Sequence, residues 1–169
     1  MKLWAVLGMG VMLAAVPAQA ADKLVVETSD NCSFTIDLRA DLAPKHVERV
    51  SALAQKGFYN GVVFHRVIDG FMAQTGDPTG TGAGGSDLPD LPAEFSQEHF
   101  ARGVVGAART SDPNSANSQF FIMFADGGFL DGQYTVFGKV SEEGMACVDR
   151  IARGEPPENP DKMTKVTVQ

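Results

Sequence analysis

The sequence predicts a mostly-β domain with two α-helices. Many short runs rich in β-branched and aromatic residues are separated by glycine-containing turns, a pattern typical of a barrel or sandwich. Two other segments place apolar residues at helical spacing. The length of 169 residues suits one domain, and an apolar content of 44% is enough for a packed core. We therefore expect a β-barrel whose two open ends are covered by the helices.

The strands are predicted from apolar runs bounded by turn residues. The chain after residue 21 opens with a hairpin, in which KLVVET (23–28) and SFTIDL (33–38) flank a Ser-Asp-Asn turn. Further strands are expected in VVFHRVI (62–68), FMAQTG (71–76), GVVGAAR (103–109), SQFFIMF (118–124), YTVFGKV (134–140) and KVTVQ (165–169).

Two segments predict the helices. The first spans 41–57, with Asp41 as its cap and Gly57 at its end. Its apolar face is formed by Val47, Val50, Leu53 and Ala54. We expect His46, near the start of this helix, to be solvated. The second helix is expected over 144–154, with the sequence GMACVDRIARG.

Residues 1–20 have the pattern of a secretory signal. Lys2 is followed by an apolar run and by the small-residue exit Ala18-Gln19-Ala20. The apolar run is short for a transmembrane helix. We therefore expect cleavage, which leaves an exported and most simply periplasmic domain of residues 21–169 with no membrane association. The alternative is a membrane anchor that stays attached.

The chain has two cysteines, Cys32 and Cys147. An exported protein meets an oxidising compartment, so this even number permits one disulfide. The alternative is two buried thiols, and the sequence leaves both open because bridging depends on the Cα separation. Their distance along the chain and the lack of a nearby His argue against a metal site.

The glycine-rich run GTGAGG at 80–85 matches the G-x-G-x-x-G pattern of dinucleotide sites. Such a site needs a helix directly after the glycines, but Pro89 and Pro92 follow and exclude one. We therefore expect a loop in which several residues have positive φ. The formal charge of −7 and the absence of a Lys/Arg run also argue against a nucleic-acid partner.

Three blocks concentrate apolar and amide side chains around isolated cations. They are FHRVIDGFMAQTGD (64–77), ARTSDPNSANSQFFI (108–122) and FLDGQYTVFGKV (129–140). The first block has no cysteine, no serine beside a histidine and no carboxylate pair spaced for acid–base work. Alternation along the predicted strands puts Gln119 and Phe121 on one face and Phe120 on the other.

In their order and spacing, these three blocks resemble the cyclophilin family of peptidyl-prolyl cis–trans isomerases. The likeness extends over nearly all of residues 21–169, and exported bacterial members look most similar. The resemblance implies a closed eight-stranded antiparallel β-barrel capped by two α-helices. It also implies a peptide groove on the outside of the barrel and a reaction that needs no cofactor and no metal.

The resemblance further implies a set of site residues. Arg66 would be the catalytic donor, with Gln74 beside it to fix the guanidinium. The substrate-binding positions would be Phe71, Met72, Ala108, Arg109, Thr110, Gln119, Phe121, Phe129, Leu130 and Tyr134.

The implied activity is rotation about X–Pro bonds in proline-containing peptides and in unfolded exported proteins. The alternative is a non-catalytic peptide-binding module or holdase that uses the same groove. Phe129 stands where many eukaryotic members have Trp, so the indole N–H that binds cyclosporin A is missing and weak cyclosporin A binding is expected. We expect a monomer.

Overall fold

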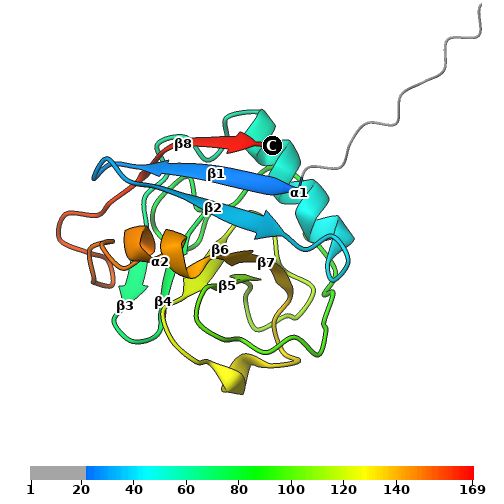
Figure 1. The fold of residues 1–169 in the computed structure, drawn as a ribbon. Coiled ribbons are helices and arrows are strands. Elements are labelled where there is room, and N and C mark those ends of the chain that lie inside the picture. The colour runs from blue at the N-terminus through cyan, green and yellow to red at the C-terminus, as the bar shows by residue number, and fades with distance from the viewer. Residues whose placement is uncertain (1–21) are drawn as a thin grey trace, which may run out of the picture.

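The computed structural model describes residues 22–169, so the predicted signal segment at 1–20 lies outside the described residues. Within this range all strands join one antiparallel sheet, in the order β3-β4-β6-β5-β7-β2-β1-β8 (Figure 1). The strands are β1 (Lys23–Thr28), β2 (Ser33–Leu38), β3 (Arg66–Ile68), β4 (Met72–Thr75), β5 (Val104–Ala107), β6 (Phe120–Met123), β7 (Val136–Val140) and β8 (Met163–Val168). No helix in this part of the chain has the length and apolar character needed to cross a bilayer.

The sheet curls into an open half-barrel, so the predicted closed barrel is wrong. Its edge strands β3 and β8 do not pair with each other. Residues 61–64, ahead of β3, meet residues 161–163 through the isolated bridge Val63–Lys162 and a few backbone hydrogen bonds, and Val67 of β3 forms an isolated bridge with Gly154. The strand predicted over 62–68 is regular only in the three residues of β3. The segment that faces β3 carries Pro156 and Pro157, which have no N–H to extend a ladder.

The predicted first hairpin is confirmed. Strands β1 and β2 pair with the register Leu24↔Ile36 and Val26↔Phe34, and all four side chains are buried. Their neighbours in sequence are partly or fully exposed, which is the alternation expected of a strand with one face on the core.

Helix α1 (Pro44–Gln55) buries the predicted apolar face and ends before Gly57, whose φ is +73°. Its start differs from the prediction, because Asp41 pairs with Arg39 and does not cap the helix. The Glu94 carboxylate instead accepts hydrogen bonds from the backbone N–H of Lys45 and His46.

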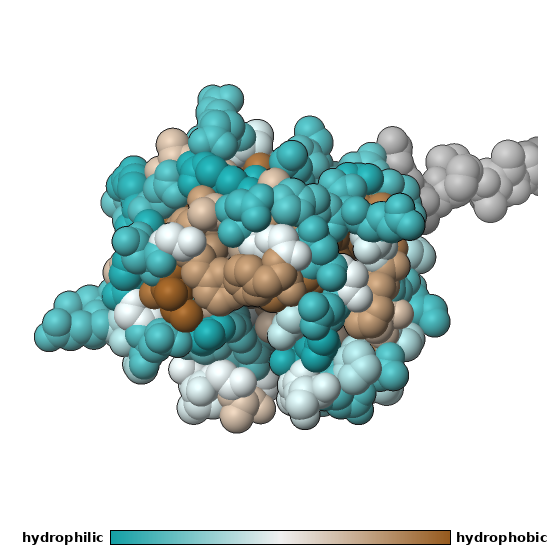
Figure 2. Space-filling view, turned by 90° about the horizontal axis from the view of Figure 1, so that it is seen from below, coloured by the Kyte–Doolittle hydropathy of each residue, from teal (hydrophilic) through white to brown (hydrophobic). Residues whose placement is uncertain are grey.

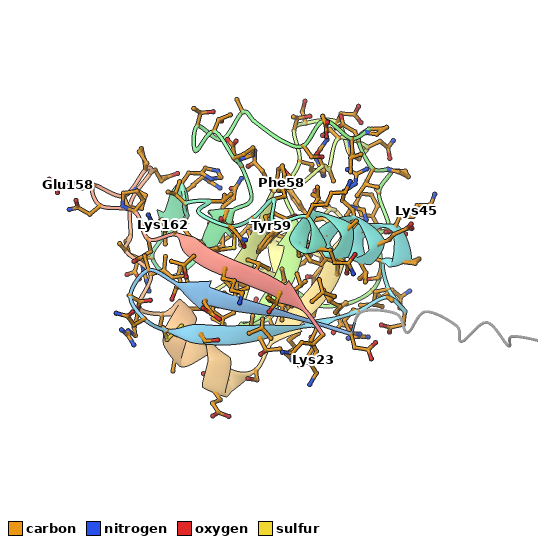
Figure 3. The ribbon with its side chains drawn as sticks, turned by 90° about the horizontal axis from the view of Figure 1, so that it is seen from above. Lys23, Lys45, Phe58, Tyr59, Glu158 and Lys162 are labelled. Carbon is orange, nitrogen blue, oxygen red and sulfur yellow. A yellow bond between two sulfur atoms is a disulfide. The ribbon has the colours of Figure 1, made fainter. Side chains whose placement is uncertain are left out.

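His46 is buried and lies 2.6 Å from Glu94 through its Nδ1, so the expectation of a solvated side chain is wrong. The reason is that a loop from a distant part of the sequence covers this end of α1. At the other end, Figure 3 shows Phe58 and Tyr59 following the helix. The Tyr59 hydroxyl donates to the Ser118 carbonyl just before β6, which ties α1 to the strand that carries Phe121.

Helix α2 (Glu142–Val148) is shorter than the predicted segment 144–154 and begins two residues earlier. Ser141 caps it, since its side chain accepts a hydrogen bond from Gly144 N. Helices α1 and α2 lie on opposite sides of the curled sheet (Figure 1), with α1 against β7 and β8 and α2 against β2. Cys32 and Cys147 form a disulfide with a Cα separation of 5.8 Å, which joins α2 to the start of β2.

Candidate active site

The strand register places the predicted site residues in rows across the sheet. Arg66 of β3 is paired with Gln74 of β4, Gln74 with Phe121 of β6, and Phe121 with Gly106 of β5. Residues paired directly across strands lie on the same face of a sheet. The sheet therefore gathers a cation, an amide and an aromatic ring into one line, although they are far apart in sequence.

Gly106, at the end of this row, and Phe100, whose ring stacks on Phe121, were missed by the sequence reasoning. A Cβ on Gly106 would lie 2.5 Å from Phe121 Cζ and 2.7 Å from Phe100 Cε1. Only glycine therefore leaves room for the two stacked rings, whose centroids are 5.7 Å apart. A glycine inside a strand pattern is the one signal that points to such a close approach.

A pocket of about 110 Å³, in which apolar side chains lie beside two arginines and an amide, is next to this row. Its lining comprises Arg66, Phe71, Met72, Gln74, Ala108, Arg109, Phe121, Leu130 and Tyr134. Tyr134 meets the edge of the Phe121 ring with centroids 5.8 Å apart. The structure thus brings nine of the predicted residues around one small cavity.

Phe129 and Leu130 belong to the short 3₁₀ helix η1 (Gly128–Leu130). Leu130 is buried in the pocket wall, whereas Phe129 is 66% exposed and packs on Phe71 with ring centroids 5.5 Å apart. Figure 2, seen from below Figure 1, shows a band of apolar side chains across this end of the molecule. Phe129 is therefore a rim residue of the groove and not part of its floor.

A second cavity of about 330 Å³, lined mainly by glycines and polar side chains, continues from the first. The two share Gln74, Ala108 and Arg109, and the second also contains Thr110 and Gln119. Its opposite wall is the glycine-rich loop 82–86. The structure thus places the two remaining predicted residues along one continuous groove, which has an apolar end and a polar end.

A chain of hydrogen bonds orders the polar side chains of the groove. Arg66 Nη1 donates to Gln74 Oε1 (3.2 Å), and Gln74 Nε2 donates to Gln119 Oε1 (2.9 Å). Gln119 Nε2 donates to the carbonyls of Gly82 (3.0 Å) and Gly84 (2.8 Å). Because carbonyls only accept, they set the orientation of both amides, and the Gln74 oxygen is thereby directed at the guanidinium.

Arg66 has a second partner on its other side. Its Nε donates to Glu155 Oε1 at 2.9 Å. Glu155 was missed by the sequence reasoning, since it lies 89 residues away in an irregular segment. The sequence carries no local signal for this contact.

The buried carboxylate of Asp77 organises the glycine-rich loop. It accepts from the N–H and hydroxyl of Thr79 and from the N–H of Gly82 and Gly84, at 2.6–3.1 Å. Burial alone would raise the pKa of Asp77, but these hydrogen bonds outweigh burial and lower its pKa to about 2. The same two glycines present the carbonyls that hold Gln119, so Asp77 supports the groove from behind.

Replacing Asp77 with alanine should therefore destabilise the protein by about 1.5–3 kcal/mol, as for hydrogen bonds to a charged group. The depressed pKa means that the contribution of Asp77 is complete above the unfolded value near 4 and is lost as the pH falls towards 2. Urea unfolding of wild type and Asp77→Asn between pH 7 and pH 2 measures the contribution of the Asp77 carboxylate to the free energy of unfolding. The wild type should lose more free energy of unfolding in acid than the variant. A parallel loss in both would contradict the assignment, and Asp87→Asn, an exposed carboxylate, is the control.

His99 joins two carboxylates beside η1. Its Nδ1 lies 2.6 Å from Asp131 and its Nε2 lies 2.5 Å from Asp126. Asp131 also accepts from Phe100 N, and Asp126 accepts from Gly128 N. This cluster therefore links the loop that carries Phe129 and Leu130 to the residue whose ring lies under Phe121.

The hydrogen bonds to Asp131 and Asp126 raise the pKa of His99, because both require a protonated imidazole. The stabilisation is complete below the usual imidazole pKa of about 6.5 and is lost as the pH rises through the raised pKa. An NMR titration of the His99 ring should give a pKa above the usual value. Asp131→Asn and Asp126→Asn should each lower it, whereas Asp112→Asn, at an exposed site elsewhere, should not. A wild-type pKa at or below the usual value would contradict the cluster.

Within residues 22–169 the structure gathers no set of three or more His, Cys, Asp or Glu side chains able to hold a metal ion. The groove instead presents the guanidinium groups of Arg66 and Arg109, two ordered amides and an apolar wall. This equipment can bind an extended peptide and direct N–H donors at it. Among the described residues that line it, no hydroxyl is hydrogen-bonded to a histidine or a carboxylate that could act as its base.

Comparison with known proteins gives a consistent result. The family model for cyclophilin type peptidyl-prolyl cis-trans isomerase/CLD matches residues 23–168. A probable peptidyl-prolyl cis-trans isomerase of Brucella suis is 50% identical over 179 aligned residues, which cover 96% of this chain and 90% of the relative. A peptidyl-prolyl cis-trans isomerase-like 1 protein of Aspergillus fumigatus is 44% identical over 137 residues, covering 78% and 82% of the two chains.

Solved structures agree in fold. A cyclophilin from Hirschia baltica has a TM-score of 0.79 and 29% identity, covering 88% of this chain and 74% of the other. A cyclophilin type peptidyl-prolyl cis-trans isomerase of Cryptosporidium parvum, crystallised in the presence of the dipeptide Ala-Pro, has a TM-score of 0.79 and 28% identity. The aligned region covers 87% of this chain and 98% of the Cryptosporidium parvum chain.

Proposed function

This chain belongs to the cyclophilin family of peptidyl-prolyl cis–trans isomerases (EC 5.2.1.8), and from this premise we propose that Arg66 is its catalytic donor and that its clients are exported proteins. The catalytic role of Arg66 is supported by the position of its guanidinium. It lies at the edge of an apolar pocket and is held there by Gln74.

The reaction needs electrostatic help rather than bond breaking. Amide resonance gives X–Pro rotation a barrier of ~18–20 kcal/mol. When the bond twists, the proline nitrogen loses that resonance and regains a lone pair. A donor directed at this lone pair binds the twisted state better than either planar ground state, which lowers the barrier. Arg66 is permanently charged and planar, and it is suited to this task.

The apolar pocket complements the donor. Phe71, Met72, Phe121 and Leu130 form a wall against which a proline ring can rest. Holding the ring still lets the acyl side of the bond rotate alone. The same wall excludes water, so the interaction of the lone pair with Arg66 is less screened. The polar end of the groove, with Gln119, Arg109 and Thr110, is where we place the peptide backbone.

Two features support exported clients and a periplasmic location. Residues 1–20 have the composition of a cleaved signal. The Cys32–Cys147 disulfide agrees with an oxidising compartment. In such a compartment, unaided X–Pro isomerisation takes tens to hundreds of seconds and limits folding.

The test of the catalytic proposal is NMR exchange spectroscopy on a short Ala-Pro peptide, which needs no coupling protease. The wild-type protein should speed cis–trans exchange far above the spontaneous rate. Binding of the peptide without faster exchange would favour the alternative function, a non-catalytic holdase. Export is tested by fractionating the cells and measuring the intact mass of the protein. The periplasmic protein should have the mass of residues 21–169. A cytoplasmic protein that retains residues 1–20 would contradict export.

Cyclosporin A should bind weakly, because Phe129 offers an exposed ring at the groove rim but no N–H donor. Phe129→Trp restores an indole donor at that rim and should tighten binding. Isothermal titration of both proteins measures the difference. Nanomolar affinity of the wild type would contradict the argument.

A further inference from the structure

Arg66 is held by two acceptors that sit on different nitrogens. Gln74 Oε1 accepts from Nη1, and Glu155 Oε1 accepts from Nε. Among residues 22–169, Nη2 has no hydrogen-bond acceptor within the protein. These two hydrogen bonds, together with the covalent attachment through Cδ, fix three points of the planar group and so determine its place and its tilt. Nη2 is thereby left to face a substrate.

The segment that carries Glu155 is held firmly beside Arg66. Val67 and Gly154 exchange two backbone hydrogen bonds, both of 2.8 Å. The residues next to this pair in sequence are Arg66 and Glu155, so the bridge brings their side chains together. Gly154 has a φ of +146°, and a Cβ there would lie 2.5 Å from Pro157 Cα. Only glycine permits this path of the backbone.

Further contacts brace both flanks of the segment. Arg153 forms an ion pair with Asp69 (3.1 Å) and donates to the carbonyl of Ile151 (2.6 Å). The Asp161 carboxylate accepts from Ala152 N (2.9 Å). Pro156 and Pro157 limit the backbone directly after Glu155. Glu155 is thus a charged side chain presented from a constrained loop, although it is itself 55% exposed.

Stability alone does not account for this arrangement. The Arg66 side chain is 42% exposed and that of Glu155 is 55% exposed, and ion pairs between exposed side chains contribute little to stability. The geometry does have a consequence for Arg66, whose long side chain has many rotamers to lose when it is held in one orientation. Without Glu155, only Gln74 would hold the guanidinium, and the group could turn about that single bond.

We propose that Glu155 is a positioning residue that orients the Arg66 guanidinium towards the reacting X–Pro bond. The proposal rests on the catalytic role proposed for Arg66. Glu155 acts through Arg66 and makes no contact with the reacting atoms. Its loss therefore affects the rotated state, where the direction of the donor matters, more than the binding of the planar peptide.

The experiment compares Glu155→Ala, Glu155→Gln and the control Glu158→Ala by NMR exchange over a range of Ala-Pro peptide concentrations. Glu158 lies on the same segment (Figure 3), is exposed, and has no ion pair or hydrogen bond to another side chain among the described residues. Glu155→Ala should lower kcat about three- to tenfold with little change in KM. Glu155→Gln keeps an acceptor oxygen and should retain most of the rate. Glu158→Ala should match the wild type.

A double-mutant cycle separates this inference from the proposed mechanism. In an Arg66→Ala background, Glu155→Ala should have no further effect, because the group that it orients is gone. Equal rates for wild type and Glu155→Ala would overturn the positioning role, and so would additive losses in the cycle. If Arg66→Ala is inactive in the same experiment, the catalytic role of Arg66 still holds. A fully active Arg66→Ala would overturn the mechanism itself. If Glu155→Ala fails to fold, Glu155→Asp, whose shorter side chain withdraws the acceptor from Arg66 Nε, should lower kcat with little change in KM. A wild-type kcat for Glu155→Asp would then overturn the positioning role.

Discussion

Replacing Arg66 with alanine should lower kcat/KM for an Ala-Pro peptide by about 10²–10³-fold, the typical value of one well-placed donor. The loss should appear in kcat, since the Arg66 interaction is strongest in the twisted state. Peptide affinity should change little, because the apolar wall formed by Phe71, Met72, Phe121 and Leu130 remains. NMR exchange spectroscopy on wild type and variant measures both quantities.

Two controls make this result interpretable. Arg150→Ala removes another exposed arginine, which pairs with Asp30 and is not part of the groove lining. It should keep wild-type turnover. Arg66→Lys keeps the charge but loses the planar fork, so an intermediate rate is expected. If Arg66→Ala turned over as fast as Arg150→Ala, the catalytic role proposed for Arg66 would be contradicted.

Breaking the Cys32–Cys147 disulfide should lower the free energy of unfolding by about 2–5 kcal/mol. The bridge joins residues 115 apart in sequence. Closing so long a loop restricts the unfolded chain strongly, and the restriction is lost when the bridge is absent. Guanidinium unfolding of the oxidised wild type, the reduced wild type and the double variant Cys32→Ala/Cys147→Ala measures the change.

The reduced wild type and the double variant should unfold at similar denaturant concentrations, both well below the oxidised protein. Turnover per folded molecule should be unchanged, since neither cysteine lines the groove. A thiol assay on the unreduced protein provides an independent count. Two free thiols, or identical midpoints with and without reductant, would contradict the bridge.

The alternation predicted along one strand is confirmed. It put Phe121 and Phe120 on opposite faces of β6, and the structure places the two rings in different apolar clusters. The family resemblance of the three blocks marked out the groove residues, and the structure gathers them along one continuous groove. Whether each performs its proposed role is the subject of the variants above.

Three of the predictions that failed concern contacts between distant segments. Asp41 was expected to cap α1, but Glu94 arrives from another loop and takes the exposed N–H groups. The same loop buries His46. The barrel was expected to close, but the segment beside β3 contains prolines that cannot continue a ladder.

By itself, the sequence determined the features that depend on neighbours along the chain. The hairpin at 23–38, the end of α1 at Gly57 and the inward and outward faces of β6 follow from turn chemistry, positive φ and strand alternation, which are local. Only the tertiary structure decided that Glu155 meets Arg66, that Asp77 holds the loop behind Gln119, and that the sheet stays open. Each of these contacts joins two segments that are far apart in the sequence. The residue pattern within one segment does not determine which other segment will lie beside it in the folded protein.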